Sequence, residues 1–424
     1  MKTDVIIVGS GVAGLYCALN LPEDKNIIIV TKSKAQESDS FLAQGGICVL
    51  RDKDDYSAFF EDTMRAGHYE NNPRSVDIMI NSSQDVIRDL VMFGTEFEKD
   101  GDEFVYTREG AHSKPRILFH EDETGKEITS ALLETVKARK NTTIIEEFTM
   151  VDLIVRDNVC YGIAGHYNNG EYISISADYT VLATGGIGGL FAHSTNFPHL
   201  TGDSIALALK YDIKLQNIDY IQIHPTTLYS QKKGREFLIS ESVRGEGAVL
   251  LNSKGERFVD ELLPRDVVAN AIFDEMKKEG TKHVWLSLAA IPVEEIKSHF
   301  PNIYNHCLEE GYDITKEPIP VVPSQHYFMG GIEVDEHSRT SMPRLFAVGE
   351  TACNGVHGKN RLASNSLLES LVFAKRAAQN ITSGYTKANF SEPPEINEEN
   401  YTNYKNKYKE MVLDAIEKEK KNRE

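Results

Sequence analysis

The stretch "DVIIVGSGVAG" (residues 4–14) decides the fold. Its unbroken apolar run at 4–8 is typical of a buried parallel strand, and three glycines spaced GxGxxG follow directly. Residues 13–21 then carry the amphipathic pattern of a helix, and residues 26–30 the apolar run of a second strand. In a β-α-β unit such glycines tighten the turn and let the backbone approach a pyrophosphate at the helix N-terminus. The stretch therefore predicts a dinucleotide-binding domain of the α/β class.

The glycine triplet Gly9, Gly11 and Gly14 taken alone also fits a purely structural turn, but its β-α-β context favours nucleotide binding. The second strand ends in Thr31 and Lys32, where a generic dinucleotide fold has an acid for the ribose. Two later strands also end in glycine, in "TVLATGG" (180–186) and "RLFAVGETA" (344–352). A long dinucleotide needs such additional turns beyond its pyrophosphate, so the sequence predicts FAD rather than NAD.

The composition narrows the class of protein further. A chain of 424 residues predicts two or three domains, and a net charge of −18 argues against nucleic acid or an anionic membrane as a partner. The five cysteines are scattered without a CxxC pair, which favours a reducing compartment over disulfides or a zinc site. No run approaches the roughly 18 apolar residues of a membrane span, and no secretory signal is visible. We expect a cytoplasmic protein without metal.

Other elements follow from periodicity. Residues 56–93 are predicted to be helical with breaks near Gly67 and Pro73, and the short β runs of 144–182 to form a meander that leads into another parallel strand. Further helices are expected at 262–279, 292–300 and 365–381, and a charged, solvated helix at 399–424. Strands alternating with helices indicate a parallel sheet.

The segment "YTREGAHSKPRI" (106–117) carries an unusual charge pattern. Four potential cations surround a single acid, Glu109; they are Arg108, His112, Lys114 and Arg116. Such a cluster indicates an anionic ligand, and the acid within it is not explained by the segment alone. A surface loop of mixed charge is the alternative.

Seven blocks carry a family resemblance: "FLAQGGI" (41–47), "ATGG" (183–186), "TGDSIALA" (201–208), "IQIHPT" (221–226), "SESVRGEGA" (240–248), "PRDVVANAI" (264–272) and "HGKNRLASNSLLE" (357–369). They resemble the flavoproteins of the succinate dehydrogenase, fumarate reductase and L-aspartate oxidase superfamily, and above all the aspartate oxidases. The resemblance implies a Rossmann-like FAD domain at 1–216 and 331–383, interrupted by an α+β capping domain at 217–330. A short helical tail at 384–424 stands where the family has a three-helix bundle.

The resemblance also implies which residues contact FAD. They are Gly9, Ser10, Gly11, Val12, Ala13, Gly14, Lys32, Asp39, Ser40, Phe41, Leu42, Ala43, Gln44, Gly45, Gly46, Asp203, Glu350, Ser366 and Leu367. In the dehydrogenase and reductase branch, a histidine five residues before the glutamine of "AQGG" tethers the flavin covalently. Asp39 occupies that position here, so the flavin is expected to be bound without a covalent link.

A four-carbon dicarboxylate needs cations at both ends. Arg361 is suited to clamp one carboxylate, because a planar guanidinium matches two oxygens. His224 and His326 are expected to donate to the carboxylates, and Gln222, Ser240 and Ser364 resemble further polar contacts of the family. The alternative for each histidine is an ordinary core or surface residue.

Arg265 resembles the proton-transferring arginine of the family, and Glu241 and Arg244 resemble the relay that feeds it. An arginine holds its proton at a pKa above about 12, so Arg265 is better supported as an essential cation than as a base. A structural ion pair is the alternative for these three side chains.

The expected reaction is hydride transfer from the substrate Cα to flavin N5, which converts L-aspartate to iminoaspartate. The segment "TREG" (107–110) resembles the aspartate oxidase segment whose glutamate faces the amino group, so the resemblance implies that Glu109 faces the substrate ammonium, which succinate and fumarate lack. In the family, O₂ or fumarate reoxidises the flavin, and quinolinate synthase takes iminoaspartate in NAD biosynthesis. The alternatives are a soluble fumarate reductase or succinate dehydrogenase flavoprotein subunit, and a non-catalytic flavin-binding sensor or carrier.

Overall fold

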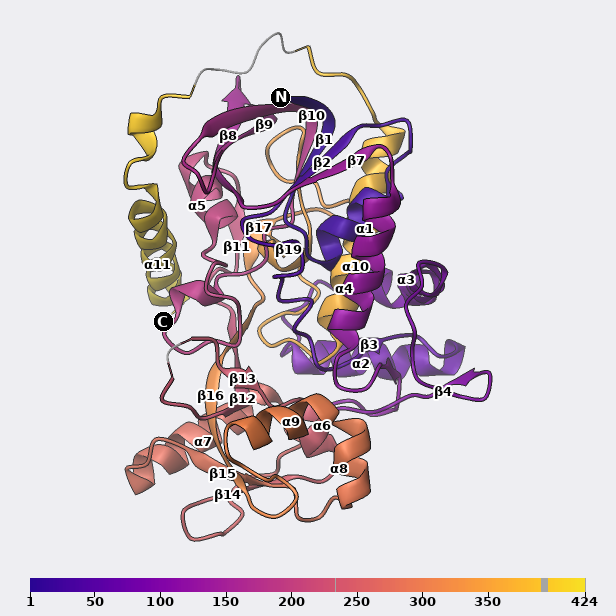
Figure 1. The fold of residues 1–424 in the computed structure, drawn as a ribbon, viewed down its shortest axis with the longest axis vertical. Coiled ribbons are helices and arrows are strands. Elements are labelled where there is room, and N and C mark those ends of the chain that lie inside the picture. The colour runs from indigo at the N-terminus through magenta and orange to yellow at the C-terminus, as the bar shows by residue number, and fades with distance from the viewer. Residues whose placement is uncertain (233, 390–395, 424) are drawn as a thin grey trace.

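The computed structural model describes residues 1–232, 234–389 and 396–423. Within these residues the largest sheet has seven strands, in the order β7-β2-β1-β10-β9-β8 with β18 paired to β10 (Figure 1). Its strands are β1 (Lys2–Val8), β2 (Ile27–Val30), β7 (Thr142–Ile145), β8 (Phe148–Arg156), β9 (Val159–Tyr167), β10 (Tyr172–Leu182) and β18 (Leu345–Ala347). β7, β2, β1, β10 and β18 run parallel, whereas β8 and β9 join antiparallel. The predicted α/β class with a parallel sheet is confirmed.

The predicted β-α-β unit is present as β1, α1 (Val12–Asn20) and β2. Side chains of β1 alternate between two cores: Val5 and Ile7 face one, and Ile6 and Val8 face the other. A strand buried on both faces explains why its sequence is continuously apolar. A Cβ on Gly14 would lie 2.1 Å from the Gly9 carbonyl oxygen, so this glycine lets α1 start close against the turn.

Helices cover both faces of the large sheet (Figure 1). The first core packs beneath α1, α2 (Tyr56–Ala66), α3 (Pro73–Met92), α4 (Thr124–Ala138) and α10 (Asn365–Ser383). The second core packs beneath α5 (Asp203–Lys210) and α11 (Tyr404–Arg423). The predicted helices at 56–93 and 365–381 are confirmed. As expected, the helical structure of 56–93 is interrupted near Gly67 and resumes at Pro73.

The expected meander is present as β8, β9 and β10, but its first β run divides in two. The run at 143–155 forms β7, which extends the parallel sheet beside β2, and then β8. Glu147 separates them with φ 57°. A left-handed residue reverses the chain locally, which ends one strand and starts the next.

A second sheet lies at the other end of the molecule (Figure 1). Its order is β13-β12-β16-β15-β14. Its strands and helices are β12 (Ile221–Leu228), β13 (Phe237–Leu238), α6 (Glu241–Gly245), β14 (Val249–Leu251), α7 (Arg265–Glu279), β15 (Val284–Ser287), α8 (Val293–His299), α9 (Pro301–Glu309) and β16 (Ile319–Phe328). Residues between 228 and 321 form a hydrophobic core of their own here. The helices expected at 262–279 and 292–300 correspond to α7 and α8.

Short strands and turns complete the chain. They are β3 (Ile47–Cys48) with β6 (Ile117–Leu118), β4 (Lys99–Asp100) with β5 (Glu103–Phe104), and β11 (Leu215–Gln216), β17 (Gly331–Glu333) and β19 (Ala352–Cys353). Single 3₁₀ turns are η1 (Lys53–Asp55), η2 (Gly188–Leu190), η3 (Gly349–Thr351) and η4 (Glu398–Tyr401). The pairing of β3 with β6 matters for the site, because it fixes the segment that carries Glu109.

The C-terminal helix is not the solvated helix that its charge suggests. In α11 the side chains of Tyr404, Tyr408, Val412 and Ile416 are buried in the second core. The spacing of four residues places these apolar side chains on one face of the helix, and the many charges occupy the rest. The prediction of a solvated helix was therefore wrong. Residues 390–395 and 424 of the expected tail lie outside the described residues.

Candidate active site

One cleft runs from the glycine turn after β1 to the second sheet, and it encloses about 1650 Å³ of empty space, part of it open to solvent. Its floor is formed where β1, β2, β10 and β18 end, so residues that follow four parallel strands line it. The carboxyl edge of a parallel sheet is the usual ligand site of doubly wound folds.

Most residues expected to contact FAD line this cleft. They are Gly9, Ser10, Gly11, Val12, Ala13, Lys32, Asp39, Ser40, Leu42, Ala43, Gln44, Gly45, Gly46, Asp203, Glu350, Ser366 and Leu367. Among the described residues that line it, neither Gly14 nor Phe41 is found. Gly14 serves the packing of α1 on the turn, and the Phe41 amide donates to the Ser38 carbonyl oxygen within its own loop.

Lys32 stands after β2, at the position where a generic dinucleotide fold has an acid for the ribose. Its ammonium lies 2.6 Å from the Asp203 carboxylate and donates to the Thr201 hydroxyl at 3.0 Å. Asp203 is the first residue of α5, so an acid does reach the rim of the cleft, from a distant segment and paired with a cation.

Two half-buried acids, Asp39 and Glu350, lie in the cleft. The Phe197 amide donates to Asp39 Oδ1 at 2.9 Å, and the Phe328 amide donates to Glu350 Oε1 at 2.9 Å. Burial raises the pKa of both carboxyls, and the proximity of Asp39 raises the pKa of Glu350 further. Asp39 therefore offers oxygen acceptors where a tethering histidine would offer a ring nitrogen.

The far end of the cleft gathers cations and imidazoles. Arg265, Arg361, His224 and His326 all line it, and the two imidazole rings lie 5.1 Å apart in an edge-to-face arrangement. Burial, reinforced by Arg265, holds the pKa of both histidines well below the ordinary value, so both rings are neutral at pH 7. Two clustered guanidinium groups and neutral N–H donors form a site for anionic oxygens.

Two buried nitrogen atoms at this end have no partner among the described residues. His224 Nδ1 lies 3.1 Å from the Thr226 amide nitrogen and 3.0 Å from the Thr226 carbonyl oxygen, whereas His224 Nε2 is buried without a partner among the described residues. Arg361 Nη1 donates to the Ser366 hydroxyl at 2.9 Å, whereas Arg361 Nε is unsatisfied. Buried polar groups are nearly always hydrogen-bonded, so these two unpartnered nitrogen atoms indicate a ligand.

An ion-pair chain stands behind Arg265. Arg265 Nε donates to Glu241 Oε2 at 2.5 Å, and Arg244 Nη2 lies 3.7 Å from the same oxygen. Although burial alone would raise it, the two guanidinium groups hold the pKa of Glu241 below its ordinary value. Glu241 and Arg244 are neighbours on one turn because the segment is helical, as α6.

Gln222 and Arg244 lie behind the cleft wall rather than among its described lining residues. Gln222 accepts from Arg265 Nη1 at 3.0 Å and donates to the Arg361 carbonyl oxygen at 2.8 Å. Arg244, fully buried, donates to the Glu261 carbonyl oxygen. Gln222 thus orients the two arginines that line the site.

Glu109 lies inside the cleft and is almost fully buried. The Ser364 hydroxyl donates to Glu109 Oε2 at 2.6 Å, and the Ser242 hydroxyl donates to Oε1 at 3.0 Å. Burial and the charge of Glu241 raise the pKa of Glu109. A Cβ on Gly45 would lie 2.7 Å from Glu109 Oε1, so this glycine leaves room for the carboxylate. Ser240, also in the lining, caps α6.

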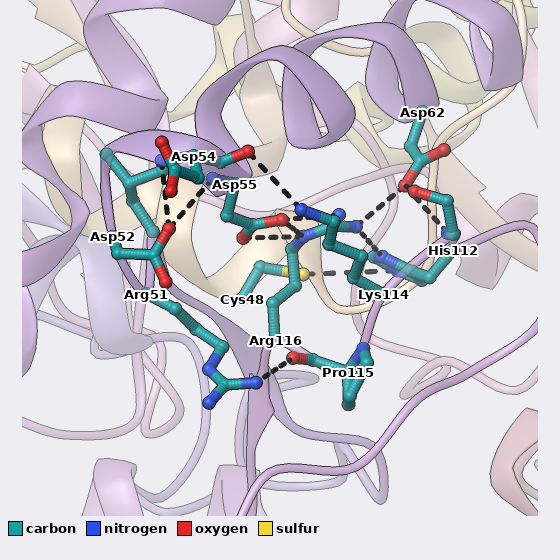
Figure 2. A network of polar contacts seen from close by, with 12 residues as sticks. Cys48, Arg51, Asp52, Asp54, Asp55, Asp62, His112, Lys114, Pro115 and Arg116 are labelled. Atoms are coloured by element: carbon teal, nitrogen blue, oxygen red, sulfur yellow. Dashed lines mark hydrogen bonds and ion pairs between the residues drawn. The ribbon is translucent and has the colours of Figure 1, made fainter.

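The expected cationic cluster around Glu109 is not a ligand site. Arg108 and Lys114 are exposed, and Arg116 is fully buried against two acids of the chain itself, Asp55 and Asp62 (Figure 2). The interpretation that four cations await an anion was wrong, because the anions for Arg116 come from another segment. Glu109 alone of these charges faces the cleft.

The sequence also left some site residues unidentified. Ser242, which donates to Glu109, lies within the block that carries Glu241, so a signal was available. Tyr327 lies beneath the Arg361 guanidinium at 4.5 Å and directly follows His326. Thr195, whose hydroxyl pairs with His326 Nδ1 at 2.7 Å, has no motif that marks it.

The cleft fits FAD. Gly11 provides no side-chain cap for α1, and the Ser40 hydroxyl accepts from the Val12 amide at 3.1 Å, so the following amides of the first turn are the backbone donors for a phosphate. Asp39 Oδ2 and Gln44 Oε1 are buried acceptors without partners among the described residues, suited to the hydroxyl groups of such a cofactor. A dinucleotide cleft that ends in an arginine and histidine site defines an FAD-dependent oxidoreductase.

Comparisons with known proteins also indicate an FAD-dependent oxidoreductase. A family model described as an FAD binding domain matches residues 4–367. L-aspartate oxidase of Clostridium perfringens is 55% identical over 381 residues, which cover 90% of this chain and 87% of that protein. L-aspartate oxidase of Clostridium acetobutylicum is 53% identical over 383 residues, 90% of this chain and 88% of that one. The chain belongs to the L-aspartate oxidase family.

A solved structure of the E. coli quinol fumarate reductase chain FrdA shares the fold, with a TM-score of 0.86. It is 29% identical and covers 99% of this chain and 74% of that chain. No helix in the part of the chain that the structure describes is long and apolar enough to span a membrane.

Proposed function

We propose that this chain oxidises L-aspartate to iminoaspartate with bound FAD. The observation that carries the proposal is Glu109, a buried carboxylate of the cleft that accepts from two neutral hydroxyls, whereas the other buried carboxylate at this end, Glu241, is paired with Arg265. The two curated relatives reported above are L-aspartate oxidases, which supports the same substrate. FAD, when bound, accepts the hydride that leaves the substrate Cα.

The arginine and histidine side chains bind the two carboxylates in this proposal. The unpartnered Arg361 Nε–H and His224 Nε2 are the groups that face a ligand in this proposal, and the Arg361 guanidinium donates to its carboxylate oxygens. Burial, with the nearby Arg265, lowers the pKa of Arg361 to about 10, which still leaves the group charged at pH 7. Tyr327 stacks beneath the Arg361 guanidinium and Gln222 holds its backbone, so this clamp is pre-oriented for a bidentate contact.

Arg265 acts as the essential cation beside the reacting carbon, with Glu241 as the acceptor coupled to it. The 2.5 Å contact between them supports this role, since an arginine exchanges a proton only with a coupled partner in place. Arg244 keeps Glu241 ionised between turnovers.

Glu109 selects the amino acid over succinate. A charge pair at about 4 Å contributes about 4 kcal/mol at an effective dielectric of about 20, and succinate has no ammonium to form it. Its neutral partners Ser242 and Ser364 orient the carboxylate without neutralising it.

A fumarate reductase is the second candidate, favoured by the shared fold with the E. coli quinol fumarate reductase chain. The Arg265–Glu241–Arg244 chain suits proton delivery to fumarate as well as proton removal. Asp39, which provides no ring nitrogen for a tether, and Glu109 both favour the aspartate oxidase reading and a non-covalent flavin.

We place the reaction at the start of NAD biosynthesis, with quinolinate synthase as the enzyme that takes the product and O₂ or fumarate as the electron acceptor. The five buried free cysteines support a reducing, cytoplasmic location.

We also propose an FAD domain at 1–216 and 331–383, a capping domain at 217–330 and a helical tail at 384–424. The separate hydrophobic core within 228–321 supports the capping domain as a unit of its own.

Anaerobic mixing of the flavin-loaded protein with L-aspartate tests the proposal. We expect bleaching of the flavin absorbance near 450 nm by L-aspartate within the mixing period, and none by an equal concentration of succinate. Bleaching by succinate alone would favour the reductase or dehydrogenase alternative. A spectrum that no dicarboxylate changes would favour a flavin-binding carrier without catalysis.

A further inference from the structure

A buried polar network holds the segment that follows Glu109, and Figure 2 shows its side chains. We call it the Arg116 network, and it comprises Asp55, Asp62, His112 and Arg116. The Arg116 guanidinium donates from Nε and Nη2 to Asp55, at 3.1 Å and 2.9 Å, and from Nη1 to Asp62 Oδ2 at 2.8 Å. Asp55 stands at the start of α2 and Asp62 within it, so the network anchors the segment after Glu109 to that helix.

His112 extends this network toward the active site. Arg116 Nη1 lies 3.0 Å from His112 Nδ1, and an arginine only donates, so Nδ1 is the acceptor. Burial and the charge of Arg116 lower the pKa of His112 to about 4, which keeps the ring neutral at pH 7. The neutral ring then carries its proton on Nε2 and donates it to the Ala363 carbonyl oxygen at 3.0 Å. Arg116 thereby fixes the tautomer.

The residue held by His112 adjoins a direct partner of Glu109. Ala363 precedes Ser364, which has φ 60° and donates from its hydroxyl to Glu109 Oε2 at 2.6 Å. The His112 amide also donates to the Glu109 carbonyl oxygen at 3.3 Å. His112 therefore joins the loop that carries Glu109 to the turn that carries Ser364.

Asp62 fixes the same loop a second time. It accepts from both the amide and the hydroxyl of Ser113, at 2.8 Å and 2.6 Å. Burying three charged groups costs desolvation that apolar side chains of similar volume would avoid, so stability alone is a weak reason for such a network. The need to orient Glu109 is a stronger reason for the Arg116 network to be present.

We propose that His112, with its tautomer set by Arg116, is a positioning residue for substrate selection. It holds the 363–364 turn against the 109–112 loop, and so aims the Glu109 carboxylate at the substrate ammonium. The inference rests on the proposed function, because it requires a substrate that carries an ammonium group. His112 itself touches neither substrate nor cofactor in this account.

Three substitutions at one position test it. In His112→Gln the amide nitrogen reaches as far as Nε2 and can still donate to the Ala363 carbonyl oxygen. In His112→Asn the shorter side chain reaches Arg116 but not Ala363, and in His112→Leu both contacts are lost. Each flavin-loaded variant is assayed for L-aspartate oxidation and for fumarate reduction, and the dissociation constant of succinate is measured from the flavin spectrum.

We expect kcat/KM for L-aspartate to fall on the order of 10- to 100-fold in His112→Leu and His112→Asn. A small displacement of the Glu109 carboxylate is enough to cause a loss of this size. Fumarate reduction and the succinate dissociation constant should change less than about threefold, and His112→Gln should recover most of the aspartate activity. If His112→Leu does not fold, the Asn and Gln variants decide the question alone.

Equal losses in both reactions, or Asn and Gln variants that behave alike, would overturn the positioning role. The wild-type protein in the same experiment separates this inference from the proposed function. Wild-type flavin that L-aspartate fails to reduce contradicts the function itself, whereas normal wild-type reduction with an unchanged substrate ratio in the variants contradicts only the role of His112.

Discussion

At the scale of single residues, Glu109 explains more of the site than any other side chain. Its two oxygens accept from the neutral hydroxyls of Ser242 and Ser364, and it does not form a salt bridge to a described residue within 4 Å. A buried carboxylate without a cation is costly, so the position indicates that a cation arrives with the ligand. The ammonium of an amino acid substrate is that cation in our account.

The charge of Glu109 predicts a pH dependence that belongs to one reaction only. Burial and the neighbouring Glu241 raise the pKa of Glu109, so it gains a proton at a higher pH than an ordinary glutamate. Protonated Glu109 attracts an ammonium less, and kcat/KM for L-aspartate should therefore fall as pH decreases through the raised pKa. The profile is measured from pH 5 to 9 beside that of fumarate reduction, which should lack this limb; an identical acidic limb in both would argue against Glu109.

Single residues also show how far sequence reasoning reaches. Glu109 was predicted because the acid among cations drew attention to the segment and because "TREG" (107–110) resembles the corresponding segment of the aspartate oxidases. Arg116 was misinterpreted because its partners, Asp55 and Asp62, are 61 and 54 residues away, and only the fold brings them together. The free Nε2 of His224 could not be foreseen either, since it depends on which side of the ring the Thr226 amide occupies.

At the scale of elements, α11 is an integral part of the second core. Tyr408 is buried, and its hydroxyl donates to the Val151 carbonyl oxygen of β8 at 2.8 Å. Tyr408→Ala should lower the free energy of unfolding by about 3 kcal/mol, as large-to-small changes of buried aromatic residues do. Denaturant unfolding measures it, with Lys409→Ala on the exposed face as the matched control.

A loss below about 0.5 kcal/mol for Tyr408→Ala, equal to that of the Lys409 variant, would mean that α11 contributes little to the fold. The sequence reading of this helix failed because 20 residues rich in lysine and glutamate conceal a stripe at every fourth position. The division of the first β run at Glu147 was missed for a different reason, because an acid does not by itself signal a left-handed turn.

At the scale of the whole molecule, the active site is assembled from the two sheet regions (Figure 1). Arg361 and Ser364 come from the segment before α10, whereas His224, Glu241 and His326 come from the second sheet and its first helix. The sequence predicted both groups from separate motifs, but not that Gln222 joins them by its contacts to Arg265 and Arg361.

Cofactor release tests the cleft as a whole. Asp39 occupies the expected tethering position with a carboxyl group whose pKa is raised by burial. We therefore expect acid precipitation of the yellow protein to leave all of the FAD in the supernatant and a colourless pellet. Flavin that stays with the denatured chain would contradict non-covalent binding.

The most direct test of the central claim is a comparison of two half-reactions in Glu109→Gln. The rate of flavin reduction by L-aspartate and the rate of reoxidation by fumarate are measured by rapid mixing under anaerobic conditions. We predict that the first falls on the order of 100- to 1,000-fold, equivalent to the loss of a charge pair of about 4 kcal/mol, and that the second changes by less than about threefold. An equal decrease in both rates, or an unchanged rate with L-aspartate, would contradict the claim that Glu109 selects the substrate by its ammonium group.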